Sequence, residues 1–211
     1  MCQNHSYSWP RPLGFVLAGL LLFGGCGGER SPGPMTEAAL WEFWSQLSSY
    51  EATIQITFFT NQTGNTYTVR QQALSSGPYR MEIVAPENVK GVLTLFDGEK
   101  TIQEDPSIGM RVTAAETPVR DALFVYSFWQ QYAQTASSSS DEKESQEEYM
   151  WEIQMEGTHE KLDHARLWLD GETGSPKRME VYDRENQVSI QMEYLDFQPN
   201  MDLDPSIFTI T

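Results

Sequence analysis

The residues best suited to chemistry lie in one short acidic stretch. His159 and His164, with Glu160 and Asp163 between them, are of types that ligate metals or transfer protons. The histidines are five positions apart across an expected turn, which fits neither a zinc-binding helix nor a serine-type triad. The sequence also shows no glycine-rich phosphate loop and no nucleophile elbow. We therefore expect a solvated acidic hairpin there, with no metal site and no catalytic residue.

Cysteine chemistry is confined to the beginning of the chain. The two cysteines, Cys2 and Cys26, precede the body, so we expect no disulfide framework and no thiolate metal site there. Residues 13–23 are uncharged and mostly apolar. This run is shorter than the about 20 residues of a membrane span but fits the roughly 7–15 of a signal-peptide core. Residues 1–25 are therefore predicted to be a signal peptide.

The end of that segment indicates a covalent lipid anchor. The sequence Phe23-Gly24-Gly25-Cys26 resembles the lipobox of bacterial lipoproteins, in which the cysteine is diacylated and becomes the new N-terminus. Acyl chains contribute about 0.8 kcal/mol per buried methylene, so two chains anchor stably. We expect Cys26 to carry the acyl chains as the only non-protein group. Residues 26–35 then form a flexible tether at the extracytoplasmic face of the cell membrane.

Charge narrows the range of partners. The 211 residues include 30 Asp and Glu against 14 Lys and Arg, a net charge of −16. Such a chain has no basic cluster that could displace counterions from phosphates, which excludes nucleic acid. Purely electrostatic attachment to an anionic bilayer is unfavourable for the same reason.

The remaining sequence predicts a single domain over residues 36–211. A helix follows Thr36, a plausible N-cap, and a second helix is expected at 118–132. A polar insert at 135–148 is too hydrophilic to pack and is expected to be mobile. Between and after them, apolar and polar residues alternate in about nine strands joined by short turns. These are 50–58, 67–73, 79–85, 93–95, 101–104, 149–155, 165–169, 179–181 and 188–197. We predict an α+β fold with a curved antiparallel sheet whose concavity holds the helices.

Fourteen apolar side chains are predicted to face the inside of that sheet. They are Tyr50, Ile54, Ile56, Phe58, Tyr67, Val69, Met81, Ile83, Leu93, Leu95, Trp151, Ile153, Leu167 and Met179. Strand alternation predicts a filled core and a lipid-binding cavity equally well. Their bulk favours the filled core, since large side chains occlude a small barrel.

Four motifs, in order along the chain, resemble the LolA/LolB-like superfamily of lipoprotein carriers and receptors. They are Gly77–Val84, Leu93–Glu99, Pro176–Asp183 and Asp202–Phe208. Within that superfamily, the lipobox and the stretch Pro86–Gly91 are most similar to the GerS-related germination lipoproteins. The resemblance implies a half-open β-barrel capped by two helices, and a non-catalytic partner of a spore-cortex amidase of the CwlD type. Gly77 stands where the carriers commonly have arginine, and a permanently acylated protein is not a soluble shuttle.

Three hypotheses about function follow. The first is a membrane-anchored scaffold for a cell-wall amidase, with Arg80, Arg178 and Glu180 as the candidate partner surface. An exposed sheet edge would also allow a homodimer by strand exchange. The second is a receptor that binds a lipid or lipoprotein acyl chain inside the barrel. The third, a peptidoglycan hydrolase, has only the acidic stretch at 159–164 to support it.

Overall fold

The described part of the chain is one β-rich domain. In this computed structural model the chain divides into two units, residues 1–31 and 32–211. The structure describes residues 33–60, 63–114, 122–135, 148–155 and 162–210. The expected signal peptide, Cys26 and most of the tether therefore lie outside the described residues, as does most of the polar insert.

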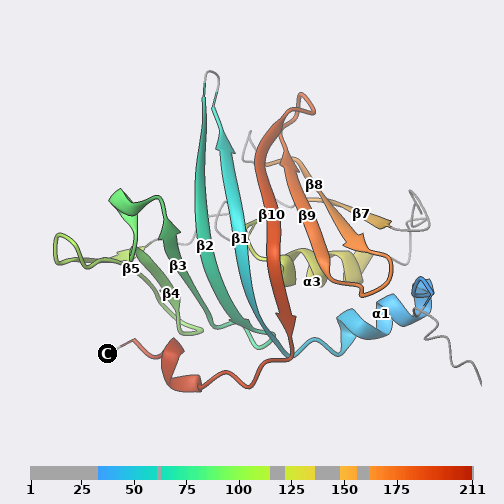
Figure 1. The fold of residues 1–211 in the computed structure, drawn as a ribbon, viewed down its shortest axis with the longest axis horizontal. Helices are drawn as coiled ribbons and strands as arrows, with labels where there is room; N and C mark the ends of the chain where they lie inside the picture. Colours follow the sequence, from blue (N-terminus) through green and yellow to red (C-terminus); the bar gives the residue numbers. More distant parts are fainter. Residues whose placement is uncertain (1–32, 61–62, 115–121, 136–147, 156–161, 211) are drawn as a thin grey trace, which may run out of the picture. The chain divides into compact units, whose positions relative to one another are not determined.

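Ten antiparallel strands form one sheet in the order β6-β5-β4-β3-β2-β1-β10-β9-β8-β7 (Figure 1). The strands are β1 (Ser49–Phe59), β2 (Gly64–Leu74), β3 (Tyr79–Ala85), β4 (Leu93–Phe96), β5 (Thr101–Asp105), β6 (Met110–Ala114), β7 (Glu148–Gln154), β8 (His164–Asp170), β9 (Pro176–Tyr182) and β10 (Val188–Pro199). Every neighbouring pair is antiparallel, so short turns connect most strands. The sheet is curved and does not close, which confirms the predicted fold class.

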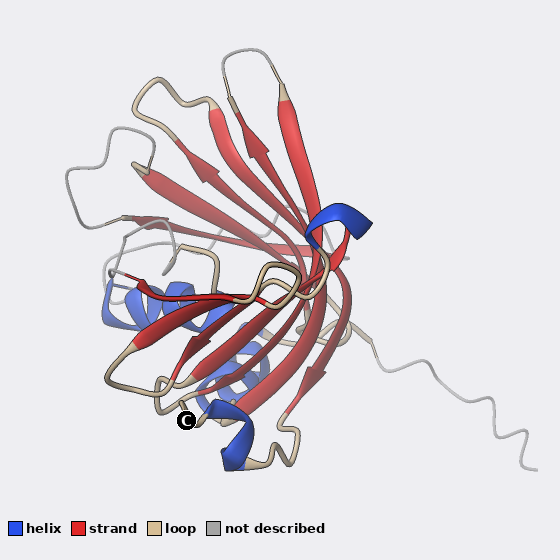
Figure 2. Cartoon of the chain, turned by 90° about the vertical axis from the view of Figure 1, so that its left-hand side faces the viewer, coloured by secondary structure: helices blue, strands red, loops and turns tan. Residues whose placement is uncertain are grey.

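Two α-helices lie on one side of the curved sheet (Figure 2). They are α1 (Glu37–Ser45) and α3 (Val125–Thr135), and two short 3₁₀ helices are η1 (Glu87–Val89) and η2 (Pro205–Phe208). Thr36 caps α1 as predicted, since its hydroxyl accepts a hydrogen bond of 3.2 Å from the Ala39 backbone N–H. No described helix is both long enough and apolar enough to span a bilayer.

Two predicted boundaries differ from the structure. The sequence pattern did not indicate β6, a five-residue strand that forms a hairpin with β5. The expected helix at 118–132 begins in the structure only at Val125; its residues 118–121 lie outside the described part. Leu123 and Phe124 instead pack against the sheet as buried residues in an irregular segment. Burial of these two side chains, and a side-chain hydrogen bond to the Leu123 carbonyl, outweigh their helical spacing.

Aromatic rings fill the space between the helices and strands β7–β10. Trp44 of α1 and Trp129 of α3 both contact Trp151 of β7, with ring centroids 6.0 and 5.5 Å apart. Tyr132 stacks on the same Trp151 ring at 4.5 Å. Such pairs add about 0.5–1.5 kcal/mol each beyond the area that they bury. This part of the concavity is therefore solid core.

Candidate functional site: the concave face of the sheet

The concave face collects most of the side chains that the alternation predicted to lie there. Twelve of the fourteen belong to one apolar cluster. Buried in it are Tyr50, Ile54, Ile56, Val69, Trp151, Ile153, Leu167 and Met179, and partly buried against it are Phe58, Tyr67, Met81 and Ile83. The period of two along each strand accounts for this placement, because alternate side chains point to the same face.

Leu93 and Leu95 correct the prediction, because they lie on the opposite, convex face. The register pairs Leu95 with Arg80 and Leu93 with Glu82, which are outward-facing positions of β3. Both leucines pack into a second cluster with Ile102 and with Phe208 of η2. The concave positions of β4 are Thr94 and Phe96 instead. The alternation of β4 was recognised from the sequence, but its phase was assigned the wrong way round.

A small apolar pocket remains on the concave face beside β1–β5. Its volume is about 150 Å³. Its lining residues are Ile56, Phe58, Tyr67, Val69, Met81, Ile83, Val92, Thr94, Gln103 and Leu123. Six of these were predicted to line a cavity. Sites for drug-sized ligands usually measure about 300–1,000 Å³, so this pocket has room for a short apolar group but not for a complete lipid.

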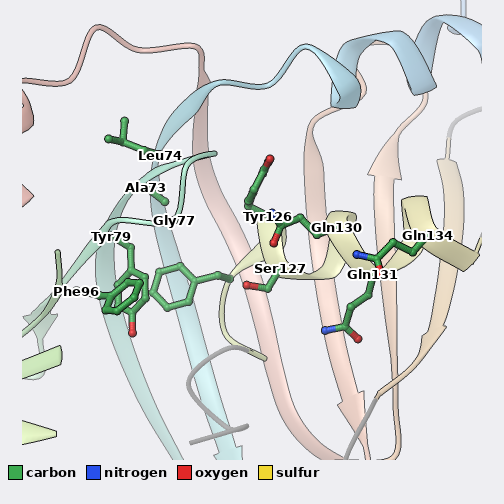
Figure 3. A pocket seen from close by; sticks show the side chains of 11 residues that line it. Ala73, Leu74, Gly77, Tyr79, Phe96, Tyr126, Ser127, Gln130, Gln131 and Gln134 are labelled. Carbon is green, nitrogen blue, oxygen red and sulfur yellow. The ribbon is translucent and has the colours of Figure 1, made fainter. Parts of the chain in front are cut away.

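A second pocket lies between α3 and the turn that joins β2 to β3. Its volume is about 340 Å³. Its walls combine uncharged polar side chains of α3 with aromatic and aliphatic side chains of the sheet. Figure 3 shows Tyr79 and Phe96 on one side and Gln130, Gln131 and Gln134 of the helix on the other. None of these residues was predicted as a site residue.

The segment Leu123–Phe124 lines both pockets. The Phe124 ring packs against Tyr79 in a tilted arrangement, with centroids 4.1 Å apart. Gln71, a fully buried residue of β2, donates a 2.9 Å hydrogen bond from its amide to the Leu123 carbonyl. The Tyr50 hydroxyl donates a 3.0 Å hydrogen bond to the Gln71 amide oxygen. These two linked hydrogen bonds hold the segment Leu123–Phe124 against the sheet.

The Tyr50 hydroxyl stays protonated in this network. Burial, and to a smaller extent the neighbouring Tyr194, hold the pKa of Tyr50 well above its ordinary value of 10.0. Tyr50 is therefore a permanent hydrogen-bond donor to Gln71. The network has a structural role, and nothing in its geometry indicates proton transfer.

The three residues predicted as a partner surface do not form one patch. All three lie on the convex face, but Arg80 is on β3 and the other two are on β9, with β2, β1 and β10 between them. Arg80 pairs with Glu82 at 2.7 Å. Arg178 lies 4.0 Å above the Trp168 ring and 3.5 Å from Glu180. Ion pairs and cation–π contacts of this kind, within one strand or between adjacent strands, are typical of a solvated sheet face.

The acidic stretch of the sequence gives no metal site in the described part of the chain. His164 stacks on Tyr182 at 4.7 Å and its Nδ1 lies 3.1 Å from Asp163. Hydrogen bonding to His164 and then to Gln154 lowers the pKa of Asp163. His159 and Glu160 lie outside the described residues. Among those described, no group of three or more histidine, cysteine or acidic side chains is arranged to hold a metal.

The comparison with known families identifies the chain's relatives. The model of the YdcC-like sporulation proteins matches residues 20–208. The chain belongs to this family. The match confirms an association with sporulation, and it spans all described secondary structure from α1 to η2.

The YdcC-like chain is also similar to several solved structures. The GerS lipoprotein in complex with the CwlD amidase, from Clostridioides difficile, has a TM-score of 0.49 at 22% identity, covering 78% of this chain and 96% of that chain. A LolA superfamily protein from Nitrosomonas europaea has a TM-score of 0.46 at 13% identity, covering 83% and 98%. A lipoprotein-sorting domain from Vibrio parahaemolyticus has 0.45 at 15%, covering 81% and 92%. No curated protein matches the chain.

Proposed function

We propose that this YdcC-like protein is a membrane-anchored, non-catalytic scaffold that binds a cell-wall amidase during sporulation. The anchor is inferred from the lipobox that ends in Cys26. Sporulation comes from the family, and the kind of partner comes from the motifs that resemble GerS-related lipoproteins. In this role the protein acts by contact at the outer surface of the membrane.

The edge strand β6 is the observation that carries the proposal. Within the described residues β6 pairs only with β5, so it leaves one row of backbone groups available for another strand. Three of the seven exposed large apolar side chains of the described chain cluster in and just before it. They are Ile108, Met110 and Val112, which are 70%, 43% and 42% exposed. An open edge with exposed apolar side chains favours a protein partner that adds a strand.

Capture of the amidase tests the scaffold. The full chain, tagged and solubilised in mild detergent, is incubated with the purified cortex amidase of the same organism. We expect wild type to retain the amidase and Met110→Lys/Val112→Lys to lose it, because lysines on an edge strand prevent strand addition. Leu195→Lys is the matched control, since Leu195 is 60% exposed at an irregularity of β10, far from β6 in the strand order. No retention by wild type, or equal retention by both variants, would overturn the proposal.

Fractionation tests the anchor separately. Wild type is expected in the membrane fraction of sporulating cells with acyl chains on residue 26, and Cys26→Ala is expected to carry no acyl group, because only the wild-type thiol can be acylated. Mass spectrometry of the mature N-terminus then identifies the acyl groups directly. An unmodified thiol at position 26 would contradict the anchor.

An acyl-chain receptor is the second candidate, and the apolar pocket beside β1–β5 favours it. A pocket of about 150 Å³ has room for the end of an acyl chain. Mass spectrometry of gently purified protein, together with titration of a fluorescent fatty acid, distinguishes this reading. A co-purified lipid that is lost in Ile83→Trp would support it, and absence of both signals would exclude it.

A further inference from the structure

Helix α3 carries two parallel stripes of very different character. Val125, Phe128, Trp129 and Tyr132 are buried against the sheet. The adjacent stripe is Ser127, Gln130, Gln131 and Gln134, at the i, i+3, i+4, i+7 spacing of one helix face. In a chain with 44 charged residues, all eleven positions of this helix are uncharged. The exposed face of a surface helix is usually charged, so a purely amide and hydroxyl stripe requires another explanation.

This stripe forms one wall of the 340 Å³ pocket (Figure 3). The opposite wall is aromatic, and it includes the half-buried ring of Phe96 next to the buried Tyr79, 5.3 Å away. Tyr126 adds a further half-buried ring from the helix itself. None of the eleven lining residues carries a charge. The pocket therefore offers flat apolar surface on one side and neutral hydrogen-bonding groups on the other.

One of these polar groups lacks a partner. The amide oxygen of Gln131 is buried, and no donor among the described residues reaches it. Buried acceptors are almost always satisfied in folded proteins, so each exception requires a specific reason. Gln131 lines the pocket, and rotation of its side chain would turn this shielded oxygen toward a donor group of a ligand. Each glutamine amide further provides two donors and one acceptor, which suits ligands that present several hydroxyl or acetamido groups.

The lining chemistry selects the class of ligand. An anionic ligand would find no lysine or arginine in the walls, and the net charge of −16 repels it. A cationic ligand would find no carboxylate. A lipid would bury the amides without partners, which is unfavourable. We propose that this pocket binds a neutral N-acetylated glycan, whose sugar ring packs on the aromatic wall and whose acetamido and hydroxyl groups bond to the glutamines. The choice of a cell-wall glycan rests on the proposed function, whereas the argument from the lining residues is independent of that function.

Calorimetric titration of the full chain in mild detergent tests this site, with a tetramer of N-acetylglucosamine as the probe. We expect saturable binding to wild type. The affinity of the variant Ser127→Ala/Gln130→Ala/Gln134→Ala for the probe should be lower by a factor of about ten or more, because two or more hydrogen bonds are lost. Gln130 and Gln134 are exposed, so the fold should be retained, and thermal unfolding verifies this. The matched control is Gln187→Ala/Gln191→Ala/Gln198→Ala, which removes three glutamines away from the pocket.

Each other outcome overturns the site. Absence of saturable binding up to about 10 mM probe excludes a useful affinity. Equal binding by the pocket variant and wild type places the glycan elsewhere. Binding of a peptidoglycan stem peptide in place of the glycan, lost in the same variant, would make the pocket a peptide site. Amidase capture by the same preparations separates the two proposals, since the pocket variant keeps β6 intact and should retain the amidase. Capture without glycan binding refutes only the pocket, and glycan binding without capture refutes only the scaffold.

Discussion

Replacement of Gln71 should destabilise the protein, and a second substitution should partly restore it. Leucine has nearly the size of glutamine, so Gln71→Leu keeps the packing but removes the hydrogen bonds of the amide to Tyr50 and Leu123, together with its weak 3.7 Å contact to the Met81 sulfur. The Leu123 carbonyl and the Tyr50 hydroxyl are then both buried without this partner. An orphaned buried group costs about 1–3 kcal/mol, so we expect the two groups together to cost about 2–6 kcal/mol.

The restoring substitution is Tyr50→Phe. Alone, it orphans the Gln71 amide oxygen and should cost about 1–3 kcal/mol. Combined with Gln71→Leu, it removes a hydroxyl that already lacks its acceptor. The double variant should therefore be about 1–3 kcal/mol more stable than Gln71→Leu alone.

Urea-induced unfolding of the full chain in mild detergent, followed by tryptophan fluorescence, measures all four proteins. Trp44, Trp129 and Trp151 lie in the core and report its loss. A double variant that is less stable than Gln71→Leu, with losses that simply add, would refute the coupling of Tyr50 to Gln71. Equal stability of Gln71→Leu and wild type would refute the whole network.

Three further predictions concern other parts of the domain. Gly174→Ala should destabilise the folded domain. The backbone at φ +70° alone costs about 1–2 kcal/mol, and the cost is larger because the new Cβ would lie 3.0 Å from Leu40. The midpoint of urea unfolding measures this loss. Phe208→Ala should cost near the lower end of about 3–5 kcal/mol, and hydrogen exchange should show the loss in β3–β5 with β7–β9 still protected. A hydrogen bond from Arg70 lowers the pKa of Glu51 below its ordinary 4.5, so its contribution to stability is present above pH 4.5 and is lost as pH falls through the lowered pKa. Wild type should therefore lose more unfolding free energy than Glu51→Gln between pH 7 and pH 3.

The strands could be predicted from the sequence because their side chains alternate strictly. In β1, Tyr50, Ala52, Ile54 and Ile56 alternate with polar residues, and all four are buried. Short strands carry less information. In β4 only four residues are available, and both Leu93 and Phe96 are apolar on opposite faces. Leu93 is covered by η2, which follows it by more than 100 residues. The neighbouring sequence therefore does not indicate which face of the sheet Leu93 occupies.

The glutamine residues show why site prediction was less successful. Gln71 occupies a concave position in the alternation of β2, where a buried amide is unexpected without knowledge of its partners. Those partners are Tyr50 on β1 and the backbone at Leu123, which only the tertiary fold brings together. The stripe on α3 did have a signal, because Gln130, Gln131 and Gln134 recur at helical spacing in a helix without charge. Neutral amides at helical spacing are equally typical of a solvated helix face, so the spacing alone does not indicate a site.

The adjacency of β1 and β10 has a consequence for how the polypeptide reaches its final state. Each half of the sheet, β1 to β6 and β7 to β10, is a local meander whose hairpins can form early. The seam between the halves pairs Tyr50 with Pro199, so it can close only after residue 199 has emerged. A truncation that ends before residue 188 would remove β10, the strand that joins β1 to β9. The meanders β1–β6 and β7–β9 would remain as separate pieces, with β1 and β9 as unpaired edge strands, and such species are prone to aggregate.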